Sequence, residues 1–152
     1  MTRYSLPLGA LCVGALLLSG TATACEDGST TLFSCIAKKS GKQIEVCDAK
    51  KTINYTFGKP GKTPELAIAA KRADVSTFQW QGIGRYISYA VNIPNGEYLY
   101  RVFWGADRLT EEHAVEAGVN VEKKGKLLAT VYCTEDSIQQ NIEGVNLKPE
   151  AE

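Results

Sequence analysis

Short stretches of alternating polar and apolar residues run through most of the chain. Residues 32–36, 43–47 and 52–57 show this alternation, and a period of two residues is typical of a strand that buries one face. Further short strands, rich in β-branched, aromatic or other apolar residues, are expected at 65–70, 78–80, 85–93, 97–104, 117–122 and 126–133. The one helical feature indicated by the sequence is a single turn within residues 137–142.

The dipeptide Asn95-Gly96 marks the clearest turn. Both residue types tolerate a positive φ, which a two-residue hairpin requires, so residues 86–93 and 97–104 are predicted to pair. A second hairpin is expected to turn at Lys123-Lys124-Gly125. Eight or nine short strands without a long amphipathic helix predict an all-β fold, a single-domain antiparallel sandwich or barrel of about eight strands stapled by disulfides.

Residues 1–24 have the pattern of an export signal and are left out of the predicted fold. Arg3 precedes an apolar run over residues 6–18, and Ala22-Thr23-Ala24 matches an A-x-A cleavage site. A membrane-spanning helix needs about 20 apolar residues, more than this run supplies. The sequence therefore predicts an exported protein without a membrane span.

Cleavage leaves residues 25–147 as one β-rich domain and residues 148–152 as a solvated tail. The protein is expected to be periplasmic or secreted, and a lipid anchor on Cys25 is the alternative. The 17 basic and 17 acidic residues of the full chain become 16 and 17 when Arg3 is lost, a net charge of −1. Since phosphate binding needs a basic surface, no nucleic-acid partner is expected.

Four cysteines remain after cleavage, namely Cys25, Cys35, Cys47 and Cys133. An even number in an oxidising compartment indicates two disulfides, and the spacings lack the close pairs of a zinc site. The absence of Cys-x-x-Cys favours a structural role over a redox role. A hairpin about residues 38–42 would place Cys35 nearly opposite Cys47, which favours that bridge and leaves Cys25 for Cys133. A bridge between Cys47 and Cys133 is nearly as compatible with the sequence.

Aromatic side chains are concentrated in residues 86–104. Alternation divides the second strand of this hairpin between two faces, one with Tyr98, Tyr100 and Trp104 and the other with Leu99, Arg101 and Phe103. One face is expected to be core and the other to cover a loop or a partner. Tyr, Trp and Arg are enriched at binding hot spots. The candidate partner-binding residues come from the glycine-containing segment before the hairpin and are Trp80, Gly82, Gly84, Arg85 and Tyr86.

Residues with catalytic chemistry are few. His113 is the one histidine of the chain, and it has no accompanying nucleophile motif, so an ordinary loop histidine is favoured over a general base. The nearby acidic residues match the residue types of a glycosidase pair, but solvated charge is the simpler interpretation of Asp107, Glu111, Glu112 and Glu116. No enzymatic activity, cofactor or metal is expected, and a His113-dependent hydrolase remains an alternative.

Several short segments resemble a family of small exported bacterial proteins without an assigned activity, namely Phe33-Ser34-Cys35, Cys47, Tyr55-Thr56-Phe57-Gly58, Glu116-Ala117-Gly118-Val119 and Cys133. This resemblance implies no mechanism. A looser one is to the bacterial inhibitors of c-type lysozyme, small exported β-barrels with a Ser-Gly-x-x-Tyr motif before a strand ending in Phe-Trp. Tyr86 and Phe103-Trp104 match that pattern, whereas Gly82 and Ile83 replace the motif's serine and glycine.

Export, disulfides, a compact β fold and the lack of a catalytic set together favour a non-enzymatic binding protein. The most concrete hypothesis is an inhibitor or immunity protein against a cell-wall hydrolase of lysozyme or amidase type. Residues 82–85 would then enter the cleft of that enzyme. A structural or envelope-stress accessory protein is the alternative.

Overall fold

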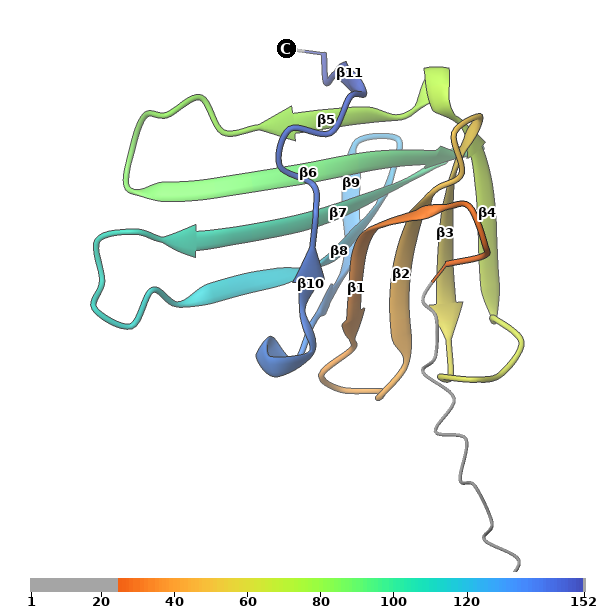
Figure 1. The fold of residues 1–152 in the computed structure, drawn as a ribbon, viewed down its shortest axis with the longest axis horizontal. Coiled ribbons are helices and arrows are strands. Elements are labelled where there is room, and N and C mark those ends of the chain that lie inside the picture. The colour runs from red at the N-terminus through yellow and green to blue at the C-terminus, as the bar shows by residue number, and fades with distance from the viewer. Residues whose placement is uncertain (1–24, 152) are drawn as a thin grey trace, which may run out of the picture.

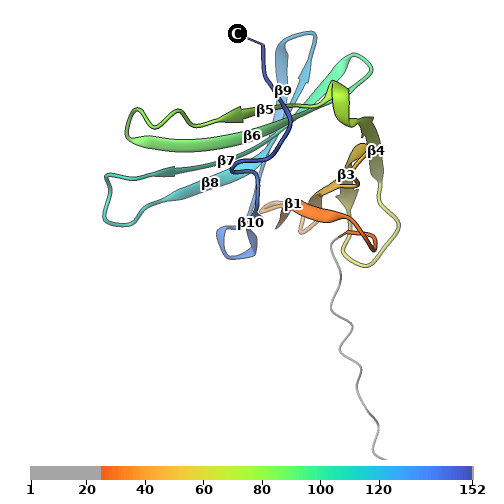
Figure 2. The ribbon, with the colours of Figure 1, turned by 45° about the horizontal axis from the view of Figure 1, so that its top comes forward.

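The computed structural model describes residues 25–151, so the predicted export signal at 1–24 lies outside the described residues. Two sheets make up the fold, in the strand orders β10-β1-β2-β3-β4 and β11-β5-β6-β7-β8-β9. Their strands run crosswise to one another (Figures 1 and 2). The all-β prediction is confirmed, and of the two architectures expected the sandwich is the one found, because the sheets do not close into a barrel.

The strands are β1 (Thr30–Ile36), β2 (Gln43–Asp48), β3 (Thr52–Gly58), β4 (Leu66–Lys71), β5 (Ser76–Gln79), β6 (Tyr86–Asn95), β7 (Tyr98–Asp107), β8 (Val115–Lys123), β9 (Lys126–Tyr132), β10 (Gln139–Gln140) and β11 (Lys148–Pro149). Two short 3-10 turns, η1 (Arg72–Asp74) and η2 (Glu135–Ser137), connect them. The helical turn expected within residues 137–142 is wrong, because η2 shares only Ser137 with that range and the strand β10 lies inside it.

The core lies between the two sheets and follows the alternation of the sequence. On the first sheet Phe33 pairs with Val46, and both are fully buried. On the second sheet Val91, Val102 and Val119 pair in a row across β6, β7 and β8, and all three are fully buried. Rows of this kind place the apolar face of each sheet against the other.

The β6–β7 hairpin forms as expected, but its turn is one residue further along. Asn95 pairs with Tyr98, so the two turn residues are Gly96 and Glu97, and Gly96 has φ of +61°. Glycine at the first turn position is typical of a type II′ turn, whereas Asn-Gly favours type I′. The shift moves the register by two residues, so every side chain keeps its predicted face.

The disulfides join Cys25 to Cys47 and Cys35 to Cys133, so the favoured pairing of Cys35 with Cys47 and of Cys25 with Cys133 is wrong. The alternative bridge between Cys47 and Cys133 is wrong as well. Cys35 pairs with Ile44 in the sheet register and shares its core-facing side, while Cys47 lies opposite Thr31 on the other face. Two side chains on opposite faces of a sheet cannot be bridged.

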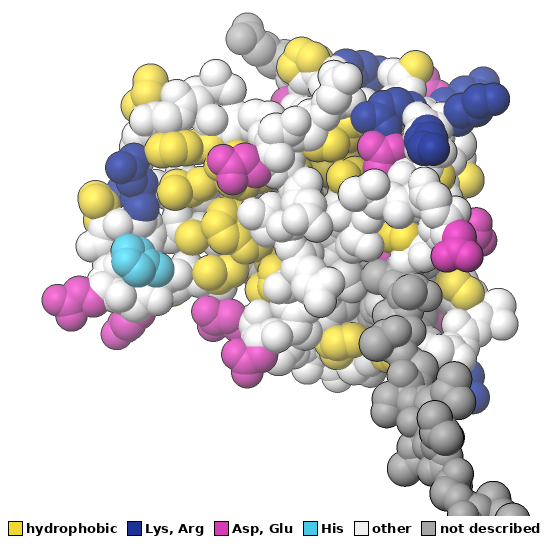
Figure 3. Space-filling model, in the orientation of Figure 1, with side chains coloured by type: hydrophobic (Ala, Val, Ile, Leu, Met, Phe, Trp, Pro, Cys, Tyr) yellow, Lys and Arg dark blue, Asp and Glu magenta, His cyan; other side chains and the backbone are white. Residues whose placement is uncertain are grey.

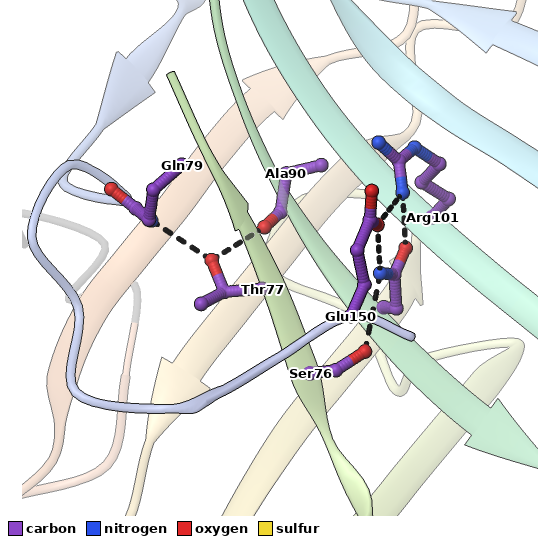
Figure 4. Close-up of polar contacts among 7 residues, drawn as sticks. Ser76, Thr77, Gln79, Ala90, Arg101 and Glu150 are labelled. Atoms are coloured by element: carbon purple, nitrogen blue, oxygen red, sulfur yellow. Dashed lines mark hydrogen bonds and ion pairs between the residues drawn. The ribbon is translucent and has the colours of Figure 1, made fainter. Parts of the chain in front are cut away.

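The end of the chain lies along the second sheet. Lys148 and Pro149 are exposed, as expected for a solvated tail, yet they also pair in parallel with β5. The carboxylate of Glu150 accepts a hydrogen bond from Asn92 Nδ2 at 2.8 Å and forms an ion pair with Arg101 (Figure 4). Burial alone would raise the pKa of Glu150, but these hydrogen bonds outweigh it and hold the pKa below its ordinary value.

Candidate partner-binding site

Two loops project together from one end of the second sheet (Figure 1). Residues 80–85 connect β5 to β6, and residues 108–114 connect β7 to β8. Because Tyr86 pairs with Asp107 at the end of the β6–β7 ladder, the two loops leave the sheet from adjacent positions. The backbone N–H of Arg108 donates to the carbonyl of Arg85 at 2.9 Å, which extends the ladder into the loops.

Side chains brace these paired loops against one another. Arg85 Nε donates to both carboxylate oxygens of Asp107, at 3.0 and 3.2 Å. The hydrogen bond lowers the pKa of Asp107 and raises that of Arg85. The guanidinium of Arg108 lies 5.2 Å from the ring centroid of Trp80, whose Nε1 donates to the carbonyl of Ile83 at 2.9 Å. These contacts hold the two loops against each other.

The two glycines of the first loop serve its backbone conformation. Gly82 and Gly84 have φ of +81° and +90°, in the left-handed region that favours glycine. A Cβ added at either position would meet no atom within 4 Å. Glycine is thus favoured at these two positions by the backbone conformation, since another residue would strain the loop backbone without meeting a neighbouring atom.

Both loops carry an exposed apolar side chain. Ile83 is 83 % exposed and Leu109 is 71 % exposed, the highest values among the large hydrophobic residues of the described chain. Single exposed apolar residues are common on protein surfaces. Here they occupy two neighbouring loops that contact each other through hydrogen bonds.

The apolar surface continues from the loops onto the sheet. Strands β6–β8 extend beyond the first sheet, and hydrophobic side chains gather over that half of the molecule in Figure 3. Trp80, Ile87 and Trp104 are only partly buried against the core. The rings of Trp104 and Tyr89 stack with centroids 6.0 Å apart, and the stack fixes the orientation of both.

Of the five predicted site residues, four belong to the first loop and the fifth begins the adjoining strand. Trp80, Gly82, Gly84 and Arg85 belong to the first loop, whereas Tyr86 begins β6 and lies against Gly105, where a Cβ would come within 2.4 Å of its ring. Burial raises the pKa of Tyr86, and its hydrogen bond to the Glu116 carboxylate raises it further. Tyr86 thus lies over the sheet at the base of the first loop, and it is 41 % exposed.

The sequence did not single out Arg108 or Leu109. Both follow the end of a predicted strand in a polar stretch, where nothing in the pattern distinguishes them from solvated residues. The signal that would have found them is the hairpin register, since pairing of Tyr86 with Asp107 places residue 108 beside residue 85.

The candidate catalytic residues are dispersed around the second loop. Glu111, Glu112 and His113 are exposed, Asp107 is bound by Arg85, and Glu116 is engaged by Tyr86. His113 has φ of +44°, which reflects the tight turn of the loop. This arrangement agrees with solvated and structural charge.

One group of metal-ligand atoms occurs among the described residues. The sulfurs of Cys25 and Cys47 and a carboxylate oxygen of Glu45 all lie within 4.8 Å of one another. Because the two sulfurs are bonded to each other, they offer no thiolate to a metal. For the same reason the sulfur of Cys25 has no valence left for the thioether of a lipid anchor.

Two disulfides fit an oxidising compartment outside the cytoplasm. Within residues 25–151, none of the helices has the length and apolar character needed to cross a membrane. Comparison with protein-family models, curated proteins and solved structures finds no match to this chain. The two family resemblances therefore stay predictions.

Proposed function

We propose that this protein is an extracytoplasmic, non-enzymatic binding protein that inhibits a cell-wall hydrolase by inserting the paired loops 80–85 and 108–114 into its cleft. The observation that carries the proposal is the exposure of Ile83 and Leu109 on two loops that are cross-braced to each other. A projecting, apolar and ordered surface complements a concave site.

The bracing favours tight binding. Ordering a mobile loop on association costs free energy, and loops held by hydrogen bonds and an ion pair avoid much of that cost. Trp80 and Arg85 are residue types that dominate binding energy at the centre of protein interfaces. Both lie within one loop beside Ile83.

The paired loops carry exposed charges of both signs. Arg85 and Arg108 lie beside the apolar residues Ile83 and Leu109, and Glu111 and Glu112 follow in the second loop. Charges of both signs around an apolar centre favour a partner with a complementary pattern of charges, since complementary potentials speed association and exclude mismatched surfaces. Lysozymes and amidases are therefore examined together, without a preference set by net charge.

The test is inhibition of peptidoglycan hydrolysis by the mature protein, with the double variant Ile83→Glu, Leu109→Glu. The double variant should inhibit at least about 30-fold more weakly than the wild type, because loss of even one hot-spot residue costs about 2 kcal/mol or more. The matched control is Leu127→Glu, Leu128→Glu, which places the same charges on half-exposed leucines of β9.

Two outcomes would contradict the proposal. If no lysozyme or amidase is inhibited by the wild-type protein, the hydrolase assignment fails. If the loop variant inhibits as well as the wild type, or if the β9 control loses as much, the paired loops are not the binding surface.

A further inference from the structure

A cleft lies between the two sheets, at the end where the β1–β2 loop faces the neighbouring ends of β8 and β9. Its volume is about 960 Å³, within the range of roughly 300–1,000 Å³ typical of small-molecule sites. Backbone bonds from Lys38 N to the Tyr132 carbonyl (2.8 Å) and from Thr134 N to the Ile36 carbonyl (2.8 Å) join the two walls. The disulfide between Cys35 and Cys133 fixes their separation.

The interior of this cleft is apolar. Its lining includes Phe57 from the first sheet and Val115, Ala117 and Val131 from the second. Phe57 pairs with Ile44 in the β2–β3 ladder, so the lining continues directly into the fully buried core. Phe57 and Val131 are only half-buried, which leaves apolar surface for a chain-like ligand to cover.

The rim is cationic. Lys38 and Lys39 line the cleft and are exposed, and neither forms an ion pair within the described residues. Lys42 lies 5.2 Å from the Phe57 ring centroid and pairs with Glu65 at 2.6 Å. Among the described residues that line the cleft, Glu116 is the one carboxylate, and it is engaged by the Tyr86 hydroxyl.

We propose that this cleft binds a free single-chain amphiphile with a carboxylate head group, of the fatty-acid class. The alkyl chain would lie against Phe57 and Val131, and the carboxylate would meet the ammonium groups of Lys38 and Lys39. The charge of the rim selects an anion, and the apolar lining selects a chain. This binding does not depend on the inhibition of a hydrolase.

The test is calorimetric titration of the mature, disulfide-bonded protein with octanoate, decanoate and dodecanoate below their micellar concentrations. Binding at one site should tighten by about fourfold for each added methylene, because burial of a methylene contributes about 0.8 kcal/mol. Dodecylamine, which has the same chain and the opposite charge, should bind at least tenfold more weakly than dodecanoate.

Variants locate the site. Lys38→Glu, Lys39→Glu should weaken dodecanoate binding by about tenfold or more, as expected when two partly exposed attractions become repulsions. The matched control Lys50→Glu, Lys51→Glu changes two residues of the β2–β3 turn by the same charge and should bind as the wild type does. Val131→Trp fills the cleft and should abolish binding in a protein that still unfolds cooperatively.

Three results would overturn the proposal. These are no saturable binding of dodecanoate, equal binding of dodecylamine, and equal losses in the two lysine pairs. Binding that appears only with anionic vesicles, and not with the monomeric acid, would assign the lysines to a membrane surface instead and would likewise refute it.

Discussion

Removal of the disulfide between Cys35 and Cys133 should destabilise the protein more than removal of the one between Cys25 and Cys47. The cysteines of the first bridge are 98 residues apart in the sequence, and those of the second bridge are 22 residues apart. In the chain-entropy model these closures stabilise the folded state by about 4.7 and about 3.4 kcal/mol. The first bridge also joins the two sheets, and both of its cysteines are buried in the core.

Urea unfolding of the two double variants, Cys35→Ala, Cys133→Ala and Cys25→Ala, Cys47→Ala, measures this difference. The first variant should lose about 1 kcal/mol more than the second from loop entropy alone. The packing of two buried sulfurs is lost in addition. An equal loss of stability in the two variants, or a larger loss in the second, would refute the idea that loop length and the link between the sheets determine how much each disulfide stabilises the fold.

The connectivity itself can be tested by peptide mapping without reduction. Trypsin leaves Cys25 and Cys35 in one peptide, because the first basic residue after Cys25 is Lys38. A second cleavage of the tryptic digest, before Asp27, separates them. It should release Cys25-Glu26 linked to the tryptic peptide that contains Cys47. Release of Cys25-Glu26 linked to the Cys133 peptide would contradict the structure.

Three further substitutions test other parts of the structure. Gly118→Ala should cost about 2 kcal/mol or more in urea unfolding, because its Cβ would lie 2.2 Å from the Val131 carbonyl oxygen. Glu150→Gln should destabilise the fold at neutral pH. Because the pKa of Glu150 is lowered in the folded protein, its contribution to the free energy of unfolding is complete above the pKa of an unfolded carboxyl group. That contribution disappears as the pH falls through the folded-state pKa. The difference in stability between the variant and the wild type should therefore vanish when unfolding is measured at acid pH. Gly84→Ala should speed amide hydrogen exchange in residues 80–85, because φ of +90° strains any other residue by about 1 kcal/mol or more; unchanged exchange would show that the loop relaxes freely.

Alternation in the sequence was enough to divide the side chains of β7 into two faces, and the structure shows which face is the core. Tyr100 and Trp104 pack on the core side of β7, and Leu99, Arg101 and Phe103 lie on the other side, as the period of two predicts. The assignment is insensitive to the position of the turn, since a two-residue change of register preserves which residues share a face. This robustness explains why the fold class followed from the sequence.

The disulfides did not follow from the sequence because the prediction used distance along a hairpin and ignored the faces. Cys35 and Cys47 are close in the β1–β2 hairpin, yet Cys35 follows the core-facing pattern of Phe33, and Cys47 is adjacent to core-facing Val46 and therefore points away. A register irregularity between Thr31 and Phe33 further changes which residues of β1 lie opposite Cys47. A bulge of this kind leaves no clear trace in the sequence.

The candidate binding site depends on the turn at the far end of the β6–β7 hairpin. With Asn95-Gly96 as the turn residues, Tyr86 would pair with Gly105, and Arg85 would lie opposite Ala106. The turn at Gly96-Glu97 moves the register by two residues, pairs Tyr86 with Asp107 and brings Arg85 within reach of the Asp107 carboxylate. The contact between Arg85 and Asp107 is thus a consequence of a turn ten residues away from Tyr86 along the sequence, and local motifs around residue 85 carry no information about that turn.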